Sequence, residues 1–204
     1  MAMPWTSAIK RKKQLVVYTG SSLGSWAGIL KDAIRDFNSL SRKHQLGVTF
    51  AESSKPSTES GVADVSVEAV NGTVTHTYDG EQMSVSLNGR IMHGLTRLLS
   101  REGKIEKALI FLPRQPQVLT PTKGVRAVGP NVMKLIAIHE LVHACGLTNN
   151  EHSSNDLFQA NPQVDSGDTA AGDKVTIQTG GKVTGMPPFV LSGPTVNHIR
   201  LLWT

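Results

Sequence analysis

The stretch His139-Glu140-Leu141-Val142-His143 decides how this sequence is interpreted. It lies in a strongly apolar segment, 132–145, which is expected to form a helix that Gly146 ends. Histidines four residues apart lie on one helix face, so both imidazoles can reach one ion about 2 Å from each ring nitrogen. Glu140 follows the first histidine, where it can hold a metal-bound water and take its proton. The stretch therefore predicts a zinc site with a general base.

A simpler interpretation is a helix whose histidines lie at the surface or are satisfied within the core. In a chain of this composition, chance places the H-E-x-x-H spacing about one time in a hundred. The apolar surroundings also make two histidines and a glutamate costly to bury without partners. We therefore favour the metal site. The remaining histidines are expected to lie in loops or at the surface: His44, His76, His93 and His198.

A catalytic zinc needs a third protein ligand and a position open to water. Gly146 ends the helix just after the histidine pair, so the chain can turn back past the metal. His152 follows six residues after Gly146 and is the preferred third ligand on ligand chemistry. Glu151, Asp156 and Asn149 are alternatives, of which the neutral amide is the poorest zinc ligand.

The segment HELVHACGL, 139–147, resembles the metzincin zinc peptidases, and within them the matrixin-like group. In their motif the third histidine stands three residues after the glycine, where this chain has Asn149. A three-residue insertion in the turn would leave the ligand role to His152. The segment 185–188 is similar to the methionine turn that metzincins share below the metal. The resemblance implies that Met186 packs beneath the zinc without binding it.

The rest of the sequence predicts one α/β (α+β) domain. Helical spacing of apolar residues predicts a long helix over 25–40, capped by Ser25, and a short final helix over 194–203. The apolar run 105–112 is a candidate central strand, and 113–130 is expected to be rich in loops. The other expected strands are 15–18, 46–51, 63–70, 73–78 and 83–87.

The order of these elements is similar to the metzincin fold. The resemblance implies a twisted mixed sheet, a long N-terminal helix, a zinc-binding helix, and a C-terminal helix after the Met-turn. It also implies an edge strand near 95–98 that would bind an extended peptide by strand addition, with Leu95 and Thr96 against the substrate. Phe189 and Val190 would line the pocket beyond the scissile bond.

The chain is expected to be one metallopeptidase domain over residues 1–204. Within it, 1–13 would be a basic N-terminal extension, and 14–152 would hold the sheet and the zinc helix. The part 153–204 would carry the Met-turn and the last helix. The basic run 10–13 is expected to be a solvated segment ahead of the first strand.

Composition excludes several other classes of protein. The net charge of +5 permits contact with nucleic acid, but no interleaved aromatic residues accompany the basic run, so no nucleic-acid partner is predicted. No apolar run reaches the roughly 18 residues of a membrane helix, and none after the basic run suits a signal peptide. We expect no membrane partner, and a location in the cytoplasm or release by a non-classical route. The single cysteine, Cys145, is expected to fill the helix interior.

The resemblance implies a zinc-dependent endopeptidase with one catalytic Zn²⁺ ion. A metal-bound water, assisted by Glu140, would hydrolyse a peptide bond of a protein or peptide substrate. Two alternatives stay open. One is a zincin of another clan with an acidic third ligand, Glu151 or Asp156. The other is a catalytically silent protein that keeps the zincin fold and binds a partner.

Overall fold

A mixed five-stranded sheet forms the centre of the fold. The computed structural model describes residues 2–19, 23–54, 63–78, 81–87, 94–120, 124–148 and 189–204. In spatial order the strands are β2 (Thr49–Ser53), β1 (Gln14–Thr19), β3 (Val65–Val70), β7 (Lys104–Pro113) and β6 (Leu95–Arg101). The first four run parallel to one another, and β6 runs antiparallel to β7. The predicted α+β class with a mixed sheet is confirmed.

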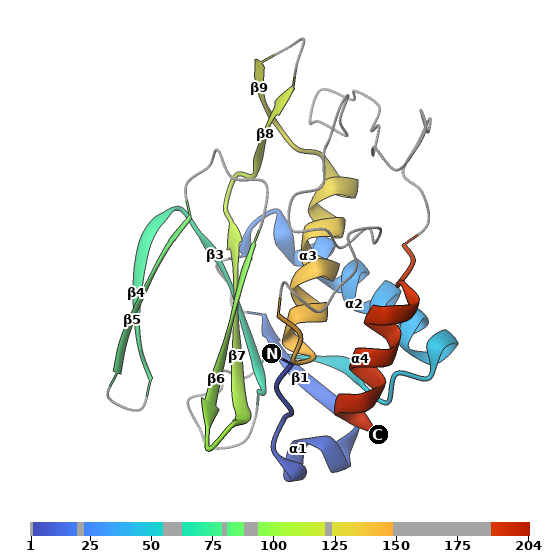
Figure 1. Cartoon of the computed structure of the whole chain (residues 1–204). Helices are drawn as coiled ribbons and strands as arrows, with labels where there is room; N and C mark the ends of the chain where they lie inside the picture. The colour runs from blue at the N-terminus through green and yellow to red at the C-terminus, as the bar shows by residue number, and fades with distance from the viewer. Residues whose placement is uncertain are drawn as a thin grey trace.

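Helices cover one face of this sheet and a hairpin covers the other (Figure 1). The helices are α1 (Ser7–Lys12), α2 (Trp26–His44), α3 (Pro130–Ala144) and α4 (Gly193–Trp203). Figure 1 shows α2, α3 and α4 on one side of the sheet, whereas β4 (Gly72–Tyr78) and β5 (Glu81–Leu87) stand on the opposite side. Each face therefore has its own apolar cluster, a large one under the helices and a small one under the hairpin.

The long helix α2 forms because its apolar residues recur at helical spacing and face the sheet. Trp26, Leu30 and Phe37 are fully buried, and the indole N–H of Trp26 donates to Pro113 O at 2.8 Å. The predicted cap at Ser25 is wrong. The backbone of Ser25 is itself helical, and its hydroxyl makes no capping hydrogen bond, because a cap needs an extended backbone to reach the free N–H groups.

The strands differ from prediction mainly at their ends. As predicted, β7 lies inside the sheet, between β3 and β6, and β6 is the last strand at its end. The predicted strand 46–51 begins only at Thr49, because the chain turns through Gly47 with φ +81°. The segment 113–130 is not only loop, since it contains the hairpin of β8 (Gln117–Thr120) and β9 (Gly124–Ala127). Strands of four residues carry too little periodicity to be predicted.

The residues ahead of β1 contact the core through Trp5. Trp5 is 1% exposed and pairs with Ile105 at the start of β7. The short helix α1 follows, and its last turn is basic. Lys13, the residue after it, has a φ of 52° and ends the helix. Arg11, Lys12 and Lys13 are exposed, as expected of a solvated run. Among the described residues, no helix combines the length and apolar character needed to cross a membrane.

Candidate metal centre

The helix α3 carries the histidine pair and is buried along almost its whole length. It packs against α2 on one side and against β6 and β7 on another, which explains its apolar composition. The predicted helix over 132–145 is thus confirmed, and it begins slightly earlier, at Pro130. His139 and His143 are each 8% exposed, and Glu140 is 2% exposed. Three titratable side chains therefore lie together in an apolar environment.

The two imidazoles point toward one another. His139 Nε2 lies 2.9 Å from His143 Nε2, and the ring centroids are 4.6 Å apart. His143 Nδ1 lies 2.8 Å from Leu147 O. Because a carbonyl oxygen can only accept a hydrogen bond, Nδ1 must be the protonated nitrogen. A neutral His143 then presents the lone pair of Nε2 toward His139, which is the tautomer that a metal needs.

The pair fits a zinc ion. Two nitrogens bound to one tetrahedral zinc lie about 3.3 Å apart, given bond lengths of about 2.05 Å. The 2.9 Å between the two Nε2 atoms is close to this separation. No third histidine, cysteine, aspartate or glutamate joins them in the described part of the chain. His152 and its alternatives Glu151, Asp156 and Asn149 lie outside the described residues, so the third ligand stays a prediction.

Glu140 is held by a residue of the edge strand. Thr96 Oγ1 donates to Glu140 Oε2 at 2.7 Å, and lies 3.2 Å from the backbone oxygen of the same residue. Burial raises the pKa of Glu140 to about 8, while the hydrogen bond from Thr96 lowers it. A cation beside the carboxylate would also favour its ionised form. Glu140 is thus a buried carboxyl group, one residue after His139, that a hydrogen bond ties to β6.

Gly94 lets the edge strand approach α3 closely. A Cβ atom at position 94 would lie 2.7 Å from Glu140 Cγ and 2.9 Å from Oε1, closer than real Cβ atoms come. Neither this contact nor the bond from Thr96 was foreseen in the sequence. A glycine directly before a predicted edge strand was the available signal, because such glycines often mark a close approach.

The C-terminal end of α3 is fixed by both ends of the chain. Trp5 Nε1 donates to Ala144 O at 2.8 Å, and Trp203 Nε1 donates to Cys145 O at 2.9 Å. These indoles satisfy carbonyls that a helix end leaves without partners. Gly146 follows with φ +107° and no room for a side chain. The turn that leaves the histidine pair is therefore tightly held, which the sequence alone did not reveal.

Cys145 is buried within this end of the helix, as predicted. Its thiol is completely enclosed, and burial raises its pKa well above the ordinary value. The side chain thus fills the core.

The residues predicted to touch substrate fall into different surroundings. Thr96 faces α3, whereas Leu95 packs in the small cluster under the hairpin, because neighbouring side chains of a strand point to opposite faces. Phe189 is partly buried, with Lys134 Nζ 5.1 Å from its ring centroid, and Val190 is 45% exposed. The predicted Met-turn residue, Met186, lies outside the described residues.

Comparisons with known proteins give matches in structure but none in sequence. No family model matches the chain, and no curated protein matches it. Among solved structures, it is similar to high choriolytic enzyme 1, a hatching enzyme zinc-protease from the medaka fish Oryzias latipes, with a TM-score of 0.42. The identity is 15%, over 100% of this chain and 98% of that chain. A likeness at this level carries no conclusion about activity.

Proposed function

We propose that this protein is a zinc-dependent endopeptidase. His139 and His143 would hold the metal ion, and Glu140 would act as general base. The observation that supports this most is the convergence of the two Nε2 atoms, 2.9 Å apart, beside a carboxylate that is 2% exposed. Burying these groups in an apolar helix is unfavourable unless something binds them, and a zinc ion would do so.

Each side chain has a defined task in peptide hydrolysis. Bound zinc would supply a Lewis acid that polarises the scissile carbonyl and acidifies the attacking water. Glu140 takes a proton from this water as its oxygen bonds to the carbonyl carbon. It then passes the proton to the amide nitrogen as the C–N bond breaks. His143 keeps its Nε2 lone pair directed into the site, because Leu147 O holds the proton on Nδ1.

The proposal includes three parts that complete the site. His152 is the third zinc ligand, and Met186 packs beneath the metal. An extended protein or peptide substrate adds to β6, next to Leu95 and Thr96, with Phe189 and Val190 beyond the scissile bond. The place of β6 as the last strand supports the substrate site, since the described residues leave one side of its backbone without a neighbouring strand.

The test is hydrolysis of an unfolded protein and of a fluorogenic peptide mixture by zinc-loaded protein, with Glu140→Gln as control. The proposal expects cleavage by the wild type, loss of cleavage in the variant, and zinc retained in both. Zinc without hydrolysis in either protein would favour a catalytically silent binding protein. His152→Ala should lose zinc. Zinc retained in that variant would instead assign the third ligand to Glu151 or Asp156.

A further inference from the structure

The edge strand β6 and the helix α3 meet through one short polar contact. Thr96 Oγ1 lies 2.7 Å from Glu140 Oε2, a distance typical of a bond between a hydroxyl and a carboxylate. We propose that Thr96 is a positioning residue, whose hydroxyl fixes the Glu140 carboxylate for proton transfer. This inference rests on the proposed peptidase function. It gives the side chain a role in the chemistry instead of direct contact with substrate.

The hydrogen bond gives the two carboxylate oxygens different roles. A threonine hydroxyl has one proton to donate, and Oε2 at 2.7 Å is closer than the backbone oxygen of Glu140 at 3.2 Å. Oε2 is therefore the oxygen that Thr96 holds. Oε1 lies toward Gly94, 2.9 Å from the position that a Cβ atom would take there, and the proposal assigns this oxygen to the attacking water. Fixing one oxygen restricts rotation of the carboxylate and orients the other.

Gly94 also helps to position the Glu140 carboxylate, from the same face of the strand as Thr96. Residues two apart in a strand point to one side, so position 94 and Thr96 both face α3. Because Gly94 has no side chain, Glu140 Cγ can lie where a Cβ atom would come within 2.7 Å. The glycine sets how near the carboxylate lies to the strand, and the threonine sets its rotation.

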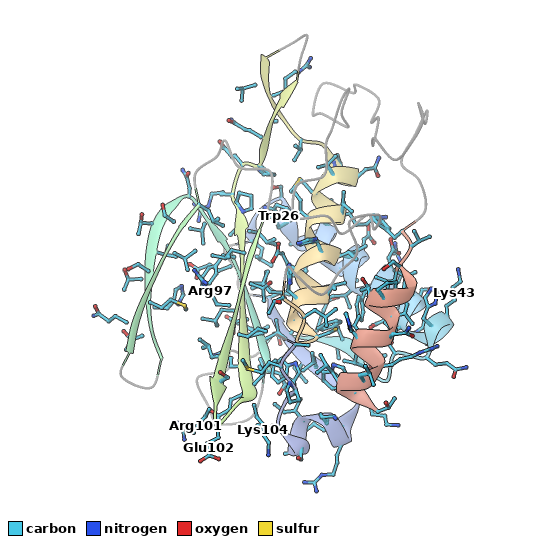
Figure 2. The ribbon with its side chains drawn as sticks, in the orientation of Figure 1. Trp26, Lys43, Arg97, Arg101, Glu102 and Lys104 are labelled. Atoms are coloured by element: carbon cyan, nitrogen blue, oxygen red, sulfur yellow. The ribbon has the colours of Figure 1, made fainter. Side chains whose placement is uncertain are left out.

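The other face of β6 takes no part in this contact. Leu95 packs in the cluster under the hairpin, and Arg97 is exposed on the side that faces β4 and β5 (Figure 2). Leu98, on the same face as Thr96, packs against the large core. Thr96 is thus the polar side chain of β6 that reaches the general base, and its substitution leaves the other contacts of the strand in place.

The first test compares Thr96→Val, which removes the hydroxyl at nearly constant shape, with Thr96→Ser, which keeps it. Loss of one hydrogen bond to a catalytic group is expected to lower kcat about tenfold in Thr96→Val. KM and zinc content should stay unchanged, because the hydroxyl bonds Glu140 and the proposal gives it no contact of its own with substrate or metal. Thr96→Ser should restore most of kcat. Thr75→Val is the matched control, since the Thr75 hydroxyl bonds Ser84 on the exposed hairpin.

A second test needs no activity. The unfolding equilibrium of metal-free protein is measured for Thr96→Val, for Glu140→Met and for the double variant, where methionine removes the acceptor but keeps most of the volume. The two substitutions should be coupled by about tenfold in the unfolding equilibrium constant. Thr75→Val combined with Glu140→Met should show no coupling.

The outcomes separate this inference from the proposed function. An active wild type whose kcat is unchanged in Thr96→Val would overturn the positioning role alone. So would a raised KM at constant kcat, which would assign Thr96 to substrate binding, or an absence of coupling with Glu140. A wild type that binds zinc but hydrolyses nothing would overturn the proposed function, and the positioning role with it, even if the coupling is present.

Discussion

Two glutamates lie against the same sheet in opposite surroundings. Glu68 on β3 pairs with His76 on β4 at 3.0 Å, with side chains that are 39% and 33% exposed. This pair lies under the hairpin, where the His76 ring also packs on Phe111, with ring centroids 5.2 Å apart. Glu140 on α3 is 2% exposed and receives its hydrogen bond from Thr96 at 2.7 Å.

The difference shows where this fold buries a charged group at a cost in free energy. A Glu–His contact this open to water contributes about 0–1 kcal/mol, so Glu68 needs no special explanation. A buried carboxylate beside two buried imidazoles is unfavourable unless partners satisfy it. Thr96 supplies one partner, and a metal ion held by the histidines would supply the counter-charge. The buried site, rather than the exposed pair, is therefore where chemistry is expected.

The largest effect is expected at Glu140 itself. Glu140→Gln keeps the shape of the side chain but removes the base, so kcat for peptide hydrolysis should fall about a thousandfold. Zinc content, measured on the same samples, should not change. A variant that keeps more than about a tenth of the wild-type rate would show that another group takes the proton. The burial of Glu140, compared with Glu68, would then not identify the catalytic base.

The next largest effect is expected where α3 ends. In Gly146→Ala the new Cβ would lie 2.2 Å from Met3 O, at a φ of +107°. We expect a loss of about 3 kcal/mol in the free energy of unfolding, measured by denaturant titration of metal-free protein. Gly28→Ala is the matched control. With no heavy atom within 4 Å of its new Cβ, it should stabilise α2 by about 0.5–1 kcal/mol. Equal effects of the two substitutions would contradict the close packing around the turn.

A smaller effect is expected at Gly94. Gly94→Ala places a Cβ atom 2.7 Å from Glu140 Cγ, so the carboxylate must move away from β6. The expected loss of unfolding free energy is about 1–3 kcal/mol, together with a lower kcat at unchanged zinc content. Gly193→Ala has open space around the new Cβ and serves as control. An active and fully stable Gly94→Ala protein would show that the contact with β6 does not matter.

The smallest effect is expected at the exposed pair. Glu68→Gln removes the negative charge beside His76 but keeps a hydrogen-bond acceptor, and it should change the free energy of unfolding by about 0–1 kcal/mol, with any electrostatic part smaller at high salt. Peptide hydrolysis should be unaffected. The measurement is denaturant unfolding at two salt concentrations, beside a kinetic assay. A change above about 2 kcal/mol would mean that the pair is far better shielded than its exposure indicates.

The parts of the fold that the sequence predicts are those with a strong repeating pattern. The apolar stripe of α2 and the continuous apolar run of β7 specify their elements, because burial on one or both faces leaves a period in the sequence. The histidine pair of α3 is predictable for a related reason, since one helical turn fixes its spacing. Both inferences depend on residues that are close together in the chain.

The contacts that hold the site could not be predicted in this way. Thr96 and Glu140 are 44 residues apart, and Trp5 reaches α3 across 139 residues. Such contacts depend on how whole elements pack, which leaves no local pattern. At Ser25 a local pattern misled the prediction: the residue type favours a cap, but the helical backbone at this position makes no capping hydrogen bond.

The most direct test of the central claim is the zinc content of purified protein, by elemental analysis, for the wild type and for the double variant His139→Ala and His143→Ala. The account predicts about one zinc per chain in the wild type and none in the variant. A wild type without zinc after reconstitution, or a variant that still binds one zinc per chain, would contradict it.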